Sequence, residues 1–178
     1  MVDSERLRIQ DRLQIERLLV SYCQHLDRMD LDSLARLFTE DCFVDYGDDP
    51  RLQSKGAECL ARSLERMWRW TRTSHHLSNI LVDFVDRDTA RCSSYVHAWH
   101  ERADGTSATI LGQYHDLVMR HPGRWLIHRR RMVMNGCDAG FTVPIHQLDR
   151  QGPPDGWTAP DIDRPAEAAG SNSRASSP

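Results

Sequence analysis

The amino-acid sequence predicts an α+β domain in which three N-terminal helices pack on a mostly antiparallel sheet. Two observations predict this class. In the first 70 residues, apolar side chains recur at steps of three and four, the period of an amphipathic helix. From about residue 73 onward, long strand-like runs are separated by short turns. Helices in one half of a chain and strands in the other are typical of an α+β domain with its helices on one sheet face.

The first half is predicted to contain the helices and one short strand. The first helix covers residues 4–27, because its apolar residues share one face: Ile15, Leu18, Leu19, Tyr22, Cys23 and Leu26. A second, short helix is expected in DLDSLARLF, residues 30–38, and a strand in CFVDY, residues 42–46, which GDDP then ends. The third helix covers residues 56–70 and places these residues on one side: Leu60, Ala61, Leu64, Met67 and Trp68.

The second half is predicted to form the sheet. Its four strand-like runs are SHHLSNILVDFVD, TARCSSYVHAWHER, ATILGQYHDLVMR and RWLIHRRRMVMNG. The segments DRD, ADGTS and HPG separate these runs and are typical of tight turns. Long strands joined by such short turns pair as an antiparallel meander. We therefore expect one domain over residues 1–150. The Pro-, Gly-, Ala- and Ser-rich tail, residues 151–178, is expected to be largely disordered.

Composition excludes several classes of function. The net charge of −3 argues against nucleic acid as a partner. No apolar stretch reaches the roughly 20 residues needed to cross a membrane, and the charged N-terminus lacks the apolar core of a signal peptide.

Five scattered cysteines without a CxxC pair are typical of reduced thiols in the cytoplasm. His97 and His100 face opposite ways on a strand, and there is neither an HExxH motif nor a Gly-rich phosphate loop, so we expect no metal and no cofactor.

Five fragments in order carry a resemblance to a known family. They are YCQHLD at the end of the first helix, LARLFTEDCFVDYG after it, HHLSN at the start of the sheet, LGQYHD in a central strand and GRWLIHRRR in the last. Over about residues 5–140 the chain resembles the SnoaL-like branch of the nuclear-transport-factor-2-like superfamily. This branch includes scytalone dehydratase, bile-acid 7α-dehydratase, a hexachlorocyclohexane dehydrochlorinase and polyketide cyclases. The resemblance implies a cone-shaped α+β roll around a mostly apolar pocket.

The resemblance also implies a catalytic pair. In enzymes of this branch, an Asp at the end of the first helix pairs with a His of the sheet, and these positions fall on Asp27 and His75. Tyr22 matches a tyrosine of the bile-acid dehydratase, whereas the dehydrochlorinase has a lysine there. The dehydrochlorinase's active-site arginine maps to Arg130.

The same residues have a physical interpretation. Imidazole takes up and returns a proton near neutral pH, and a carboxylate on its other nitrogen fixes the tautomer. A tyrosine hydroxyl can stabilise a developing enolate. Two alternatives stay open from the residues alone: Asp27 and Asp30 could each cap a helix, and Tyr22 and Asp27 point about 140° apart on an ideal helix.

Four further residues are candidates for substrate binding. His75 and His76 face opposite ways on a strand, so at most one enters the pocket, and the family spacing favours His75. Strict alternation would place His76 on the same face as Ile80, Val82 and Phe84. His100 shares its strand face with the positions where related dehydratases carry a second His or an Asp, here Val96 and Ala98. The four candidates are Tyr46, His76, His100 and Arg130.

The sequence therefore predicts a cofactor-independent lyase, a dehydratase that uses a His–Asp dyad to abstract a proton. The expected substrate is small and largely apolar, such as a steroid, polyketide or terpenoid-like compound. The alternatives are an isomerase or cyclase on the same fold, or a non-catalytic ligand-binding or assembly subunit. We also expect a homo-oligomer, either a dimer or a trimer, as is common in this family.

Overall fold

The computed structural model describes residues 2–149 and 152–158, with side chains described from Arg6 onward. The chain divides into a unit of residues Met1–Leu148 and a second segment, Asp149–Pro178. In the second segment, the described part contains a turn at residues 155–156. The predicted disorder of residues 151–178 falls mostly outside the described residues.

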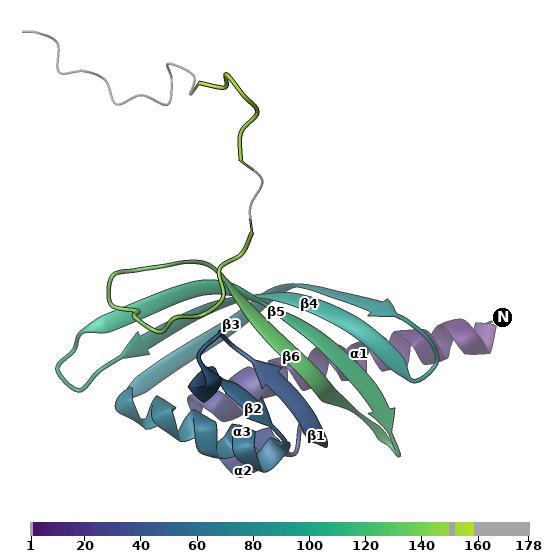
Figure 1. The fold of residues 1–178 in the computed structure, drawn as a ribbon. Coiled ribbons are helices and arrows are strands. Elements are labelled where there is room, and N and C mark those ends of the chain that lie inside the picture. Colours follow the sequence, from purple (N-terminus) through teal and green to yellow (C-terminus); the bar gives the residue numbers. More distant parts are fainter. Residues whose placement is uncertain (1, 150–151, 159–178) are drawn as a thin grey trace, which may run out of the picture. The chain divides into compact units, whose positions relative to one another are not determined.

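Helices come first in the larger unit and long strands follow, which confirms the predicted α+β class (Figure 1). The helical elements are α1 (Val2–Asp27), α2 (Leu31–Ala35), η1 (Pro50–Leu52), α3 (Ala57–Leu64) and η2 (Glu65–Arg69). The strands are β1 (Phe38–Asp45), β2 (Gln53–Lys55), β3 (Arg72–Phe84), β4 (Thr89–Glu101), β5 (Ser107–His121) and β6 (Arg124–Cys137).

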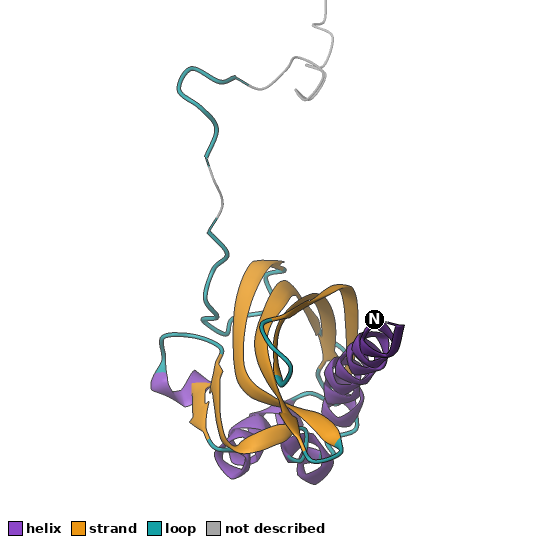
Figure 2. Ribbon diagram, turned by 90° about the vertical axis from the view of Figure 1, so that its right-hand side faces the viewer, coloured by secondary structure: helices purple, strands orange, loops and turns teal. Residues whose placement is uncertain are grey.

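All six of these strands belong to one curved sheet, in the order β2-β1-β6-β5-β4-β3. Each pair of neighbours is antiparallel except β1 and β6, which run parallel. Figure 2 shows the sheet bending over the helices, which gather on one side of it. Within the described residues, no helix combines the length and apolarity needed to cross a bilayer.

The first half of the chain differs in detail from the sequence prediction. β1 begins at Phe38, so it takes the last residue of the predicted second helix, and α3 ends at Leu64, where the tighter helix η2 continues to Arg69. The elements η1 and β2 were not predicted. Each spans only three residues, which is too short to produce a periodic pattern.

A bulge in β3 overturns the simple alternation expected for this strand. The register shifts between Ser78 and Leu81, and Asn79 adopts a left-handed backbone with φ of 51°. Asparagine tolerates this left-handed conformation better than most residues. The extra residue of a bulge shifts the alternation, so the side chains after it face the opposite way from the one that strict alternation predicts. Before the bulge, His75 pairs with Ala98, and after it, Val82 pairs with Cys92. Ala98, Val82 and Cys92 are all buried. His75 and Val82 therefore face the same side, which strict alternation would forbid.

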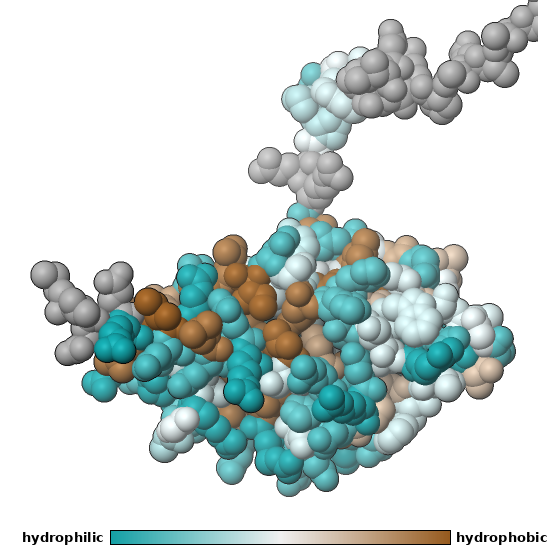
Figure 3. Space-filling model, turned by 180° about the vertical axis from the view of Figure 1, so that it is seen from behind, coloured by the Kyte–Doolittle hydropathy of each residue, from teal (hydrophilic) through white to brown (hydrophobic). Residues whose placement is uncertain are grey.

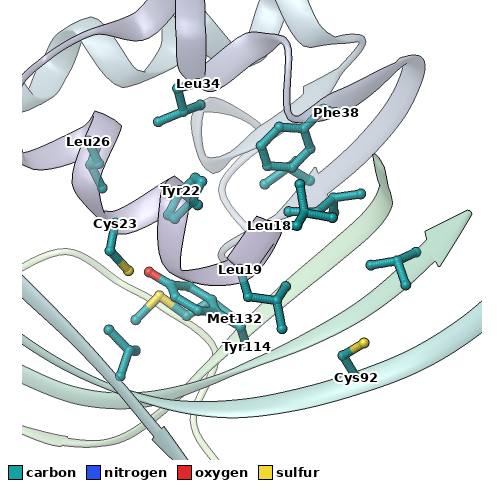
Figure 4. Packing of buried hydrophobic residues seen from close by; sticks show 14 of the residues in the cluster. Leu18, Leu19, Tyr22, Cys23, Leu26, Leu34, Phe38, Cys92, Tyr114 and Met132 are labelled. Carbon is teal, nitrogen blue, oxygen red and sulfur yellow. The ribbon is translucent and has the colours of Figure 1, made fainter. Parts of the chain in front are cut away.

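The core lies between α1 and the concave face of the sheet. Figure 4 shows α1 directing Tyr22, Cys23 and Leu26 toward Tyr114 and Met132 of the central strands. Some apolar residues of α1 are exposed, and Figure 3 shows apolar patches on the face of the molecule seen from behind. These residues are Leu7, Ile9, Leu13 and Val20.

Candidate active site

The end of α1 and the start of β3 bring Asp27 and His75 together. Oδ1 of Asp27 lies 2.6 Å from Nδ1 of His75, and Oδ2 accepts the backbone N–H of His75 at 3.0 Å. Thr73 donates its hydroxyl to Oδ1 at 2.8 Å. The carboxylate is thus held from three directions by one strand.

Asp30, not Asp27, caps the next helix. Asp30 accepts the backbone N–H of Ser33 at 3.1 Å at the start of α2, as an N-cap residue does. Asp27 is the last residue of α1, and its side chain turns to β3 instead. The angular separation of Tyr22 and Asp27 on the helix is therefore no obstacle, because Asp27 bonds His75 and His75 lines the same cavity as Tyr22.

The contact fixes the proton position on His75. Burial tends to raise the pKa of Asp27, but hydrogen bonds from the side chain and backbone of His75 outweigh it, and the net pKa is lowered. Asp27 is therefore a carboxylate at neutral pH and only accepts hydrogen bonds, so Nδ1 of His75 carries the proton. Nε2 of a neutral His75 is then an unprotonated base, and it has no partner among the described residues.

His75 lines a mostly apolar cavity between the helices and the sheet. The cavity volume is about 70 Å³, well below the roughly 300–1,000 Å³ of ordinary ligand pockets. The His75 side chain is only 4% exposed. The lining residues are Tyr22, Leu26, Tyr46, Leu52, Leu64, Arg66, Met67, Arg69, Trp70, His75, Ala98, His100, Ile110, Tyr114, Met132, Phe141, Val143 and Ile145.

Two candidate tyrosines meet in this cavity. The hydroxyls of Tyr22 and Tyr46 are 2.7 Å apart, and both side chains are buried. Burial raises the pKa of Tyr22 well above its ordinary value and also raises the pKa of Tyr46, so both phenols are protonated at neutral pH. One hydroxyl donates to the other, which leaves the acceptor's own proton available to a ligand.

His100 also faces the cavity and is neutral. Burial, followed by the nearby charge of His75, lowers its pKa to about 4. Its Nδ1 lies 3.2 Å from the carbonyl oxygen of Ala108, which only accepts, so Nδ1 carries the proton and Nε2 is an acceptor. The rings of His75 and His100 meet edge to face at 5.3 Å.

Arg130, a candidate for substrate binding, is not one of the residues that line the cavity. It is 1% exposed, and its Nε and Nη2 donate to the carboxylate of Asp116 at 2.8 and 2.9 Å. Its guanidinium carbon sits 4.2 Å from the ring centroids of both Tyr22 and Tyr114. Asp116 and Arg130 are direct partners in the register of β5 and β6, so the two charges form a buried ion pair.

His76, a candidate for substrate binding, does not line the cavity. His76 is exposed on the opposite face of β3, where Ser74 contacts its Nε2 at 2.9 Å. Alternation before the bulge turns it away when His75 faces inward.

Sequence reasoning missed two groups of lining residues. The segment after β6 crosses the cavity with Phe141, Val143 and Ile145, and their every-second-residue spacing in FTVPI was a usable signal. Met134 donates its backbone N–H to the carbonyl oxygen of His146 and accepts the backbone N–H of Leu148, and these bonds hold this segment in place. The other group is Arg66, Arg69 and Trp70, at the end of the predicted third helix, where no family motif pointed to the cavity. Among the described residues, no cluster of three or more His, Cys, Asp or Glu side chains is arranged to hold a metal ion.

Known structures share this architecture. A candidate scytalone dehydratase from Novosphingobium aromaticivorans is 30% identical and aligns with a TM-score of 0.76 over 85% of this chain and 100% of that one. A hexachlorocyclohexane dehydrochlorinase, LinA-type3 from Novosphingobium barchaimii, aligns with a TM-score of 0.67 over 80% of this chain and 97% of that one. At 21% identity, the second comparison shows the fold alone.

The sequence comparisons agree with the structural ones. The uncharacterized protein Rv2910c of Mycobacterium tuberculosis is 32% identical over 126 residues, which cover 68% of this chain and 84% of the relative. The SnoaL-like domain family matches residues 7–131. The predicted resemblance is confirmed: this chain belongs to the SnoaL-like domain family, within the nuclear-transport-factor-2-like superfamily.

Proposed function

We propose that the protein is a cofactor-independent lyase that removes water from a small, largely apolar molecule. One observation carries the proposal: His75 bonds a carboxylate through Nδ1 and lines an apolar cavity. This is the arrangement that a general base needs, because the carboxylate stabilises the imidazolium formed when Nε2 takes a proton. Such help typically accelerates a reaction about 10²–10⁴-fold.

The reaction follows from the charges available. Nε2 of His75 takes the proton from a carbon next to a carbonyl group, and the electron pair moves to form an enolate. A hydroxyl group on the next carbon then leaves as the enolate collapses to a carbon–carbon double bond. The imidazolium of His75 returns its proton to that leaving oxygen, so the products are an enone and water and the enzyme is unchanged.

The tyrosine pair stabilises the enolate oxygen. Of the Tyr22 and Tyr46 hydroxyls, the one that accepts from the other keeps a proton to donate into the cavity. A donor that is already in place, in a site with little water, stabilises a developing negative charge more than the neutral carbonyl. Isomerisation uses the same enolate without loss of water. The candidate dehydratase among the structural relatives favours dehydration as the first choice.

The proposal depends on movement of the segment that crosses the cavity. A volume of about 70 Å³ holds no more than a few water molecules, so a ring compound needs more room. Phe141, Val143 and Ile145 line the cavity from the segment after β6, which can withdraw without breaking the long strands.

The test uses purified protein and two ketone probes. The α-hydrogens of 2-tetralone exchange with deuterated water when a base forms its enolate, and 3-hydroxy-1-tetralone loses water to give 1-naphthol. We expect the protein to accelerate both reactions, and His75→Ala to abolish the acceleration while probe binding persists. His76→Ala, a change on the opposite face of the same strand, should leave both rates unchanged.

Each outcome bears on the assignment. Exchange without dehydration would assign an isomerase, and equal acceleration by the His75→Ala variant would overturn the proposed base. If the wild-type protein binds the ketones but accelerates neither reaction, a ligand-binding or assembly subunit replaces the enzyme as the better account.

A further inference from the structure

Two arginines at the end of the helical region line the cavity, and a third lies beside them. Arg66 and Arg69 are three residues apart in η2, and residues with this spacing lie on the same side of a 3-10 helix. Arg102, from the turn after β4, places its guanidinium carbon 5.0 Å from the ring centroid of Trp70. The guanidinium carbon of Arg69 lies 5.8 Å from the same centroid. Trp70 is itself a lining residue, so both cations gather at one rim of the cavity.

These cations lack carboxylate partners. Within the described residues, no carboxylate oxygen lies within 4.0 Å of a guanidinium nitrogen of Arg66, Arg69 or Arg102. Two carboxylates near the three arginines have other partners. Asp49 pairs with Arg51, and Glu101 pairs with Arg72. Asp104, which follows Arg102 closely, accepts from Thr106.

The positive charges of these arginines repel one another, and they act to lower the pKa values of groups that line the cavity. Burial, then the charges of Arg66 and Arg102, lower the pKa of Arg69. The charge of Arg66 acts on Tyr46, and that of Arg69 acts on His100, and both of these residues line the cavity. Since the whole chain carries a net charge of −3, this is a local concentration of positive charge and not a general property of the surface.

One of the arginines is held in position. Nη1 of Arg66 donates to the backbone oxygen of Ser63 at 2.9 Å and also contacts the Ser63 hydroxyl. No acceptor among the described residues takes the N–H groups on its Nε and Nη2. A guanidinium anchored at one nitrogen, with its other donors unused, is prepared to bind an oxyanion through two parallel hydrogen bonds.

We propose that the ligand of this cavity carries an oxyanion, which Arg66 and Arg69 bind at the rim while the apolar body enters beside His75. Arg102 adds positive charge from beside Trp70. The inference rests on the proposed function in that it assigns the substrate class of the same cavity: an apolar hydroxy-ketone that bears an acidic group. The oxyanion is a carboxylate of the substrate itself or a phosphate of a carrier to which the substrate is attached.

The test compares acids with their neutral amides. Calorimetric titration of the full chain would use three matched pairs: 2-naphthoate and 2-naphthamide, cyclohexanecarboxylate and its amide, and decanoate and decanamide. We expect the acid of at least one pair to bind about tenfold or more tightly than its amide, as charge-assisted hydrogen bonds imply. The preference should weaken as salt rises, because the arginines lie at the solvent-facing rim.

Variants connect the preference to the arginines. The double variant Arg66→Gln/Arg69→Gln should bind acid and amide almost equally. Arg62→Gln, on the preceding helix and outside the cavity lining, should keep the full preference. Three results would overturn the inference: equal binding of acid and amide in every pair, no binding of any acid, or a preference that persists in the double variant.

Two further probes identify the source of the oxyanion. Tighter binding of 2-naphthoyl-coenzyme A than of 2-naphthoate would assign the anion to a carrier phosphate, and weaker binding would assign it to the substrate's own carboxylate. All titrations would be repeated with His75→Ala. An acid preference in that variant, together with failure of the ketone reactions in the wild-type protein, would leave this inference standing and remove only the proposed reaction.

Discussion

Nδ1 of His75 lies 2.6 Å from Oδ1 of Asp27, although 48 residues separate them in the chain. The end of α1 supplies the carboxylate and the start of β3 supplies the imidazole, so the contact exists only when helix and sheet are packed together. A second bond, from the His75 backbone to Oδ2, fixes the carboxylate relative to the strand itself. The strength of the proposed base therefore depends on tertiary structure.

Changing Asp27 to Asn should reduce the dehydration rate about 10²–10⁴-fold with little loss of probe binding. The amide keeps the size of the side chain but removes the charge that stabilises the imidazolium. Steady-state kinetics on 3-hydroxy-1-tetralone would measure the effect. Asp30→Asn is the matched control, since asparagine caps α2 as well as aspartate does and the rate should not change. A full rate in Asp27→Asn would exclude the carboxylate from the mechanism.

The two cavity hydroxyls should be energetically coupled. Tyr22→Phe or Tyr46→Phe alone leaves the other hydroxyl buried without its partner, and each change should cost about 1 kcal/mol in the free energy of unfolding. The double variant should lose less than the sum of the two, because no unsatisfied hydroxyl remains. Denaturant titration of all four proteins completes the cycle, and simple additivity would contradict a direct bond.

His100 should make the protein less stable in mild acid. Its pKa is about 4 in the folded state, mainly because it is buried, against an ordinary value near 6.5 in the unfolded chain. Between these values the unfolded state binds the extra proton, so stability falls as the pH falls from about 6.5 to 4. The full effect is about 3 kcal/mol.

The variant His100→Gln should flatten this part of the pH dependence, as measured by urea titration at a series of pH values. His97→Gln changes an exposed histidine of the same strand and should leave the slope as it is. An unchanged slope in His100→Gln would show that other groups cause the acid sensitivity.

Removing one charge of the buried pair Asp116 and Arg130 should lower the free energy of unfolding more than removing both charges. Asp116→Asn leaves a buried guanidinium without its counter-charge, and the expected loss is about 3–5 kcal/mol in the free energy of unfolding. The double change Asp116→Leu/Arg130→Met removes both charges together and should be less destabilising than Asp116→Asn. Thermal unfolding would compare them, and the reverse order would mean that the charges stabilise the fold outright.

The sequence predicts the larger features because they depend on repeated patterns. Apolar spacing located α1 and the four long strands, and family spacing identified Asp27 and His75. The bulge at Asn79 was not predictable in the same way, since a single left-handed residue leaves no periodic trace. That bulge decides which side chains after it face inward.

Pairing across strands was equally hidden from the sequence. Arg130 could be assigned to the site by family position, but its burial against Asp116 follows from the register of β5 and β6. The cavity-facing roles of Arg66 and Arg69 depend on the change from α3 to the tighter helix η2, which the predicted continuous helix did not include.

The central claim concerns the proton on one imidazole, and nitrogen-15 NMR of histidine-labelled protein at neutral pH reads it directly. For the neutral form of His75 we expect a protonated Nδ1 hydrogen-bonded to Asp27 and a free, unprotonated Nε2, with the signal assigned by its loss in His75→Ala and the Nδ1 proton shifted in Asp27→Asn. A His75 ring protonated at Nε2 instead, or one whose spectrum ignores the Asp27 substitution, would contradict the account.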